Sequence, residues 1–287
     1  MGYDDYSQRI RKEIYPLSLK NALIISIGLT VFVAEAGLCH DFWIEPDSFM
    51  PQTGETVDVR LREGVNLKGN TLPFIPEWFT DFSTVSNIGR TPVESIIGDD
   101  PAAVIAVPKG ALLMGYRSTR NFVDLDAEKF NRYLDEEGIE FIREQRRNLG
   151  QDDMSAPEYF VRCAKALIQA SAGGDEIYAT ELGYILELVA EDDPYKLRPG
   201  DEINFRLIYR GEPAAGLLVQ AFTRDNPDQR QRIRTDANGR ATIQLSEAGI
   251  WMIKAVNIQP IIGDPKALWQ SYWASYLFEL ADSLPKP

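Results

Sequence analysis

The second half of the chain is divided into short apolar runs by turn residues at regular intervals. These runs cover residues 184–189, 203–209, 216–222, 249–256 and 272–280. The residues between them include Asp-Asp-Pro at 192–194 and Asn-Gly at 238–239, which favour tight turns because asparagine and glycine accept positive φ angles. This spacing predicts an antiparallel β-sandwich over residues 179–287.

The first part of the chain after residue 39 has a similar pattern. Residues 56–62 alternate apolar and polar side chains, as expected for a half-buried strand. Further short runs follow at 93–97, 103–107 and 112–118, with glycine, proline and aspartate between them. We therefore expect a second β-sandwich region over residues 40–121.

Helical periodicity separates these two regions. Phe130, Tyr133 and Leu134 have the spacing of one helix face, and Gly138 is a suitable stop. A second helical stretch follows it. A third helix is predicted from Ser155 to residue 168, because Ser155 and Glu158 form a capping-box pattern. The expected fold is mainly β, with a helical insert at residues 122–178.

The first 39 residues have the pattern of an export signal. Arg9, Arg11, Lys12 and Lys20 precede an apolar run at residues 22–34. Small residues place possible cleavage points after Ala36 or after Cys39, and an uncleaved membrane anchor is the alternative. In each case we expect the folded part in the periplasm or cell envelope.

Composition narrows the possible functions. The chain has 30 basic and 43 acidic residues, a formal net charge of -13, which argues against nucleic-acid binding. Its cysteines are Cys39 and Cys163, and His40 is its single histidine. A standard zinc site needs a cluster of such residues and is excluded. Cys163 is expected to be a small buried residue of the third helix.

His40 is the residue that most favours a metal-binding function. Cleavage after Cys39 would leave its α-amine free beside its imidazole Nδ1, and both atoms can chelate one transition-metal ion. Nitrogen ligands of this kind suit cobalt, nickel and copper, with affinity rising in that order. A cut elsewhere leaves His40 as part of a structural amino terminus, and this alternative stays open.

One histidine does not complete a metal site, so oxygen ligands are expected to assist it. Asp41 and Glu45 are nearest in sequence. Glu187 is a long-range candidate, because a carboxylate within an apolar strand needs a partner. That partner is equally well an arginine such as Arg117, or the amino-terminal amine without a metal.

No enzymatic function is predicted. Hydrolysis requires an activated nucleophile or paired carboxylates in a cleft, and the residue pattern indicates neither. The acidic residues at 191–193 precede a proline and are typical of a solvated turn. The copper centre of polysaccharide monooxygenases needs a second histidine, which this chain lacks.

Two resemblances add to this interpretation. The turn and strand around Thr235-Asp236 and Gly249–Trp251 resemble transthyretin-like or carboxypeptidase-regulatory-like modules, so the C-terminal sandwich is expected to be transthyretin-like or immunoglobulin-like. After residue 39 the chain as a whole resembles the DUF4198 family. The matching segments are 40–46, 157–167, 183–188, 235–240, 249–251 and 269–275.

The DUF4198 resemblance implies an exported protein, often described as the periplasmic component of a cobalt or nickel uptake system. It implies an inner-membrane metal transporter as a partner, while the oligomeric state stays open. In this family the histidine usually follows a small residue that ends the signal; here Cys39 takes that place, so cleavage after Ala36 remains possible. The alternative function is a structural or adhesion scaffold of the cell envelope that binds no metal.

Overall fold

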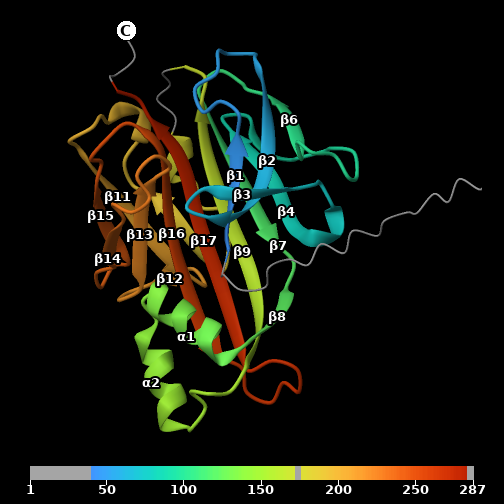
Figure 1. The fold of residues 1–287 in the computed structure, drawn as a ribbon. Coiled ribbons are helices and arrows are strands. Elements are labelled where there is room, and N and C mark those ends of the chain that lie inside the picture. Colours follow the sequence, from blue (N-terminus) through green and yellow to red (C-terminus); the bar gives the residue numbers. More distant parts are fainter. Residues whose placement is uncertain (1–39, 172–175, 283–287) are drawn as a thin grey trace, which may run out of the picture. The chain divides into compact units, whose positions relative to one another are not determined.

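The fold is mainly β, with three sheets and two α-helices among the residues that the computed structural model describes, 40–171 and 176–282 (Figure 1). The expected export signal, both cleavage points and Cys39 lie outside these residues. Within the described ranges, every helix is too short or too polar to cross a membrane.

The largest sheet has nine strands. Its order is β14 (Gln231–Arg234), β13 (Leu218–Thr223), β16 (Gly249–Pro260), β17 (Trp269–Leu280), β9 (Ala156–Gln169), β7 (Ala111–Ser118), β4 (Phe79–Ser86) and β5 (Gly89–Pro92), with β8 (Asn121–Leu125) beside the start of β9. Strands β17 and β9 pair in parallel and the other neighbours are antiparallel. Strands from both expected sandwich regions therefore share one sheet.

Two four-stranded sheets cover this large sheet. One contains β1 (Asp41–Pro46), β2 (Thr56–Val65), β3 (Lys68–Leu72) and β6 (Ala103–Ala106). The other contains β10 (Leu186–Ala190), β11 (Glu202–Tyr209), β12 (Glu212–Pro213) and β15 (Arg240–Gln244). Short 3-10 turns lie in the connections, at η1 (Pro76–Trp78), η2 (Glu176–Ala179) and η3 (Pro194–Lys196). The expected class, mainly β with sandwich packing and intervening helices, is confirmed.

Strand β9 corrects the predicted third helix. Its side chains alternate between two cores: Cys163 and Leu167 pack with the β10–β11 sheet, whereas Ala164, Ala166 and Ile168 pack with the β1–β2 sheet. Because successive strand residues point to opposite faces, the two small sheets lie on opposite faces of the large one. A strand buried on both faces has a continuous apolar sequence, which resembles a helix when read alone.

The other two predicted helices form a hairpin, α1 (Ala127–Glu136) and α2 (Glu140–Asn148). Asp126 caps α1 by accepting a hydrogen bond from the Lys129 backbone N–H at 2.9 Å. Gly138, which lies between the helices, has a φ of 66°. The buried face of the hairpin includes Phe130 and Tyr133, and it packs against β16 and β17.

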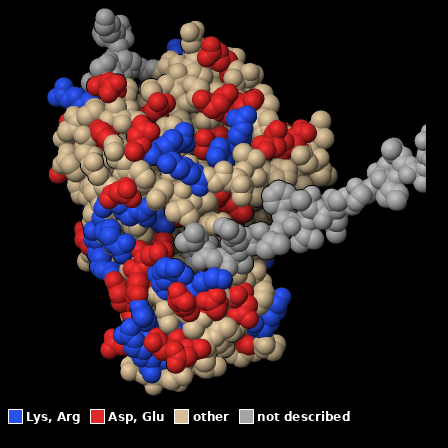
Figure 2. Space-filling view, in the orientation of Figure 1, with Lys and Arg blue, Asp and Glu red and all other residues tan. Residues whose placement is uncertain are grey.

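Arginines of β14 attach this hairpin to the sheet. Arg232 donates to the Glu136 carbonyl at 2.8 Å, and Arg234 donates to the Gly138 carbonyl at 2.9 Å. Arginines at the carboxyl end of a helix satisfy carbonyl groups that the helix itself leaves unpaired. Basic and acidic side chains are correspondingly intermixed over the lower part of the face shown in Figure 2.

A buried carboxyl group lies near the start of β9. Glu158 is 2% exposed and faces Trp269 in the parallel β9–β17 pair. It accepts a hydrogen bond from Ser271 Oγ, which accepts one from Trp273 Nε1 at 2.9 Å. No cation pairs with Glu158 among the described residues. Burial raises the pKa of Glu158 to about 8, although the Ser271 hydrogen bond acts in the opposite direction.

The raised pKa of Glu158 predicts how the stability of the folded protein depends on pH. An unfolded glutamate ionises near its ordinary pKa of 4.5, whereas folded Glu158 ionises near 8. Its contribution is therefore complete below pH 4.5 and is lost as the pH rises through 8, about 5 kcal/mol in total. Glu158→Gln should remove this loss. Urea unfolding between pH 4.5 and 8.5 measures it.

The control for this experiment is Glu144→Gln, a change to an exposed side chain of α2. It should leave the pH dependence of the native protein unchanged. An equal pH dependence in Glu158→Gln and the native protein would show that this carboxyl group has no such effect.

Candidate functional site

The fold begins one residue after His40. Strand β1 starts at Asp41, whose Cα pairs with that of Gly64 on β2. The next residues are buried, and Trp43 is fully enclosed. The Phe42 carbonyl accepts a hydrogen bond from Ser275 Oγ of β17 at 2.7 Å. His40 itself is half-buried, so it lies at the edge of a firmly packed strand.

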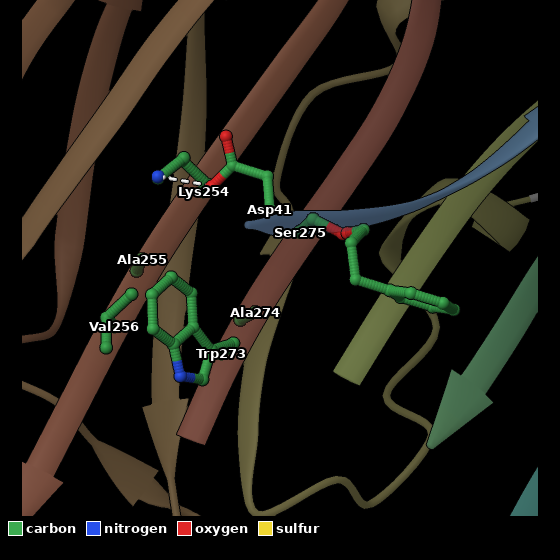
Figure 3. A pocket seen from close by; sticks show the side chains of 8 residues that line it. Asp41, Lys254, Ala255, Val256, Trp273, Ala274 and Ser275 are labelled. Atoms are coloured by element: carbon green, nitrogen blue, oxygen red, sulfur yellow. Dashed lines mark hydrogen bonds and ion pairs between the residues drawn. The ribbon is translucent and has the colours of Figure 1, made fainter. Parts of the chain in front are cut away.

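The Asp41 carboxylate is part of a buried group of charges. It pairs with Lys254 of β16, and Lys254 Nζ also donates to Glu137 Oε1 at 2.7 Å. The three side chains are between 5% and 7% exposed. Figure 3 shows the Asp41–Lys254 pair beside a small pocket. The pocket is lined by Asp41, Phe42, Lys254, Ala255, Val256, Trp273, Ala274 and Ser275.

Further side chains extend this group into a longer polar chain. Glu137 Oε2 accepts from Gln220 Nε2 at 2.8 Å, and Gln220 Oε1 accepts from Arg230 Nη1 at 2.8 Å. Arg230 Nη2 donates to Asn66 Oδ1 at 2.5 Å. We call the series Asp41, Lys254, Glu137, Gln220, Arg230 and Asn66 the polar chain. It contains two carboxylates and two cations, so its formal charges balance.

The two ends of the polar chain, Asp41 and Asn66, both lie near the β1–β2 pair. Asn66 lies two residues after Gly64, the partner of Asp41. Asn66 and Leu67 have φ values of 55° and 57°, which is unusual for a leucine. Arg230 holds this turn from one side, and Leu67 is 3% exposed. The packing around the turn therefore keeps it in a strained conformation.

The environment changes the pKa of two groups of the polar chain. Burial raises the pKa of Glu137, and the negative charge of Asp41 adds to this effect while Lys254 opposes it. Burial alone would lower the pKa of Lys254. The charges of Asp41 and Glu137 outweigh this effect, so the Lys254 pKa is raised. Lys254 is therefore a permanent cation between two carboxyl groups.

Glu45 lies between two arginines. Its carboxylate is 3.3 Å from Arg62 Nε and 3.1 Å from Arg224 Nη2, and it accepts a hydrogen bond from Trp43 Nε1 at 2.7 Å. This carboxylate is already surrounded by donors in the folded chain.

Glu187 is more completely enclosed. It accepts hydrogen bonds from the backbone N–H groups of residues 182–184 at 2.6 to 2.9 Å and pairs with Lys165 of β9. Its partner is therefore Lys165 rather than Arg117. Burial lowers the pKa of Lys165, while the Glu187 charge opposes this effect. The Glu187 carboxylate and the Lys165 ammonium group therefore lie together on the face of the large sheet that β10 covers.

The four candidate ligands are not gathered at one point. Asp41 and Glu45 lie on one strand, separated by roughly 13 Å at the ordinary rise of a β-strand. Glu187 lies in the other small sheet, on the opposite face of the large sheet. Within the described ranges, no group of three histidine, cysteine or acidic residues is placed to hold a metal ion.

The sequence does not by itself predict that Lys254 and Glu137 join Asp41. Lys254 is the one charged residue in the apolar run 249–256. A lysine in such a run indicates a buried side chain that has an ion-pair partner. Glu137 follows two other acidic residues and resembles the surface of a helix. Cys163 was expected in a helix; it is buried in β9, and burial raises the pKa of its thiol to about 12.

A family model described as "Domain of unknown function (DUF4198)" matches residues 38–259. The chain belongs to the DUF4198 family. The match confirms the family resemblance, and the family's description assigns no function. No curated protein matches this DUF4198 chain.

Two solved structures are similar to parts of this DUF4198 protein at low identity. One is a tetra-tandem repeat in the extending region of a large adhesion protein, with 10% identity and a TM-score of 0.21. The alignment covers 85% of this chain and 50% of that one. The other is a mutant of Salmonella alpha-2-macroglobulin, with 13% identity, a TM-score of 0.17, and coverage of 84% and 15%. The chain thus spans half or less of either, and at these scores neither informs its function.

The buried charges predict a large effect of Lys254→Met on stability. The change leaves Asp41 and Glu137 buried without their cation, and it should lower the free energy of unfolding by about 3–5 kcal/mol. Urea unfolding followed by tryptophan fluorescence measures this loss. Lys109→Met, which changes an exposed lysine, is the matched control and should have little effect. A loss below about 1 kcal/mol in Lys254→Met would contradict the assigned role.

Glu187→Gln separates a structural role of Glu187 from a metal-binding one. The change leaves Lys165 without its counter-charge, so the free energy of unfolding should fall by about 3–5 kcal/mol. Affinity for nickel and copper, measured by calorimetry on the folded variant, should remain that of the native chain. A tenfold loss of affinity with unchanged stability would identify Glu187 as a ligand.

Proposed function

We propose that this protein is a non-enzymatic binding protein of the periplasm or cell envelope, and that it binds a transition-metal ion through an amino-terminal His40. An inner-membrane metal transporter is the proposed partner, and uptake of nickel or cobalt is the proposed process. Copper is the alternative cargo, because imidazole and amine nitrogens favour it in competition.

The observation that carries this proposal is the position of His40 directly before β1. Asp41 is 6% exposed and paired with β2, so a chain cleaved after Cys39 presents one residue ahead of a rigid strand. The α-amine and the imidazole Nδ1 both belong to His40 and can close one chelate ring on a metal ion. A chelate therefore needs no rearrangement of the fold.

The proposed ligand set is smaller than the sequence alone indicated. Asp41, Glu45 and Glu187 all pair with cations of the protein, and releasing any of them would leave a buried or half-buried charge unpaired. We therefore assign the two nitrogens of His40 as the protein ligands, with water or a partner protein in the remaining positions. An incomplete ligand set suits an ion that is passed on rather than retained.

A scaffold of the cell envelope without a metal is the second candidate function. The observation that favours it is that the three carboxylates are engaged in ion pairs inside the chain. In this alternative, the polar chain serves to fix β1, the helical hairpin and the β2–β3 turn in one arrangement.

Metal titration of a chain that begins at His40 tests the proposal. Such a chain is released from an amino-terminal ubiquitin fusion during synthesis and checked by intact mass. We expect stoichiometric binding with affinity rising from cobalt to nickel to copper. His40→Ala should weaken nickel binding at least a hundredfold, because it removes the imidazole and hence the chelate. Calorimetry measures the affinities, and far-ultraviolet circular dichroism confirms the fold.

A chain with one additional alanine before His40 is the matched control. It keeps the imidazole but moves the free amine to another residue, so its nickel affinity should fall as well. Equal nickel affinity in the native, extended and His40→Ala chains would exclude the His40 site and favour the scaffold function.

A further inference from the structure

The buried pair of Lys165 and Glu187 connects two different sheets. Lys165 lies on β9 of the large sheet, and Glu187 lies on β10 of the small sheet that covers it. Both side chains are 2% exposed, and Lys165 Nζ is in direct contact with Glu187 Oε1. An amine and a carboxyl group are the two reactants that form an amide bond, and a fold that holds them together replaces their chance encounter in solution.

The hydrogen bonds of Lys165 orient its nitrogen. An ammonium group has three N–H donors. Lys165 Nζ donates to the Thr180 carbonyl at 2.9 Å and to the Leu188 carbonyl at 3.0 Å. The third donor lies along the contact with Glu187. When this third proton passes to the carboxylate, the lone pair of the resulting amine takes its direction. The two carbonyl groups therefore aim the lone pair at Glu187.

Burial favours this transfer of a proton. It lowers the pKa of Lys165, although the charge of Glu187 acts in the opposite direction. In a site without water, an ammonium and a carboxylate lose their hydration, whereas a neutral amine and a neutral carboxyl group lose much less. The neutral amine is also the nucleophile, since a protonated amine has no lone pair to donate.

The carboxyl group of Glu187 lies among backbone N–H groups. Leu182 donates to Oε1 at 2.6 Å, and Gly183 and Tyr184 each donate to Oε2 at 2.9 Å. When an amine adds to a carboxyl carbon, negative charge develops on oxygen, and N–H groups fixed around that oxygen stabilise the charge. The folded chain thus holds a directed amine and an oxyanion site at the same carboxyl group.

We propose that Lys165 and Glu187 join in an intramolecular amide bond in the folded chain. One proton passes from Lys165 Nζ to a carboxylate oxygen of Glu187, and the neutral nitrogen then adds to Cδ. The bond between Nζ and Cδ forms, and the bond between Cδ and the protonated oxygen breaks. This oxygen takes a second proton from the nitrogen and leaves as water, while the amide keeps the third. The reaction needs no oxidant, reductant or other reactant.

The amide bond fastens the β10–β11 sheet to the large sheet. It closes a ring of chain from residue 165 to residue 187, and this ring remains closed when the chain unfolds. The closed ring restricts the unfolded chain and so favours the folded state. Among the described residues Cys163 is the one cysteine, so a disulfide cannot supply this link. The bond is independent of the metal-binding function, because β1 packs on the other face of the large sheet.

Peptide mapping of the full chain, purified in its folded state and then denatured, tests the proposal. Trypsin cuts after a free lysine but not after one whose amine carries an acyl group. Without the amide, the segment yields separate peptides 163–165 and 166–196. With the amide, the cut after Lys165 is blocked. We expect a single peptide 163–196 that is lighter than its sequence by the mass of one water molecule.

A second digestion locates the link. A protease that cuts after glutamate opens the ring at Glu176 and Glu181. The two pieces that contain Lys165 and Glu187 should then remain joined, because the amide bond connects them. Fragmentation of the joined pieces identifies the two residues.

The matched control is a chain with both Lys165→Met and Glu187→Met. Removal of both charges leaves neither one buried without a partner, so this chain should fold. It should give peptide 163–196 at the full mass of its sequence. In Glu181→Gln, which changes an exposed carboxylate near Lys165, the amide should form as in the native chain.

Two outcomes would overturn the proposal. One is the recovery of peptides 163–165 and 166–196 from the native chain at the masses of their sequences. The other is the same loss of water in peptide 163–196 of the chain with both changes, which would show that the water comes from other residues.

Discussion

Burial of β9 on both faces is the constraint on which the rest of the structure depends. Each of its core residues contributes to one of two hydrophobic layers, so the strand fixes both small sheets at once. Its neighbours β7 and β17 come from distant parts of the sequence. The chain therefore forms one continuous β-structure from segments that, read separately, resemble two independent sandwiches.

Charges inside this structure are placed in pairs. Lys165 on β9 meets Glu187, and Lys254 on β16 meets Asp41 and Glu137. Buried ion pairs add little net stability compared with apolar residues of the same size, but removal of one partner is costly. We infer that these pairs disfavour other registers of the strands that carry them. We infer that the polar chain acts in this way for β1, since its members come from both ends of the molecule's sequence.

Local patterns in the sequence predicted much of the fold. Strands β2, β10, β11, β13, β16 and β17 and helices α1 and α2 follow from alternation, turn residues and helical spacing. The prediction was wrong for β9 because its capping-box residues and apolar run fit a helix equally well, and only burial on two faces decides between them. Of the candidate site, His40 and Asp41 were predicted from their position. Lys254, Glu137 and Arg230 were not, because contacts across the whole chain bring them to Asp41.

The parallel pairing of β9 with β17 has a consequence for the order of events during folding. Strand β17 is the last strand of the described fold, and it supplies Ser275 to the Phe42 carbonyl and one side of the layer that holds β1. During synthesis the chain cannot complete this layer until β17, which ends at Leu280, has been made. Among the described strands, the first, β1, therefore completes its packing only after the last, β17, is available. More than two hundred residues separate β1 from β17, so β1 remains without this packing partner while they are synthesised.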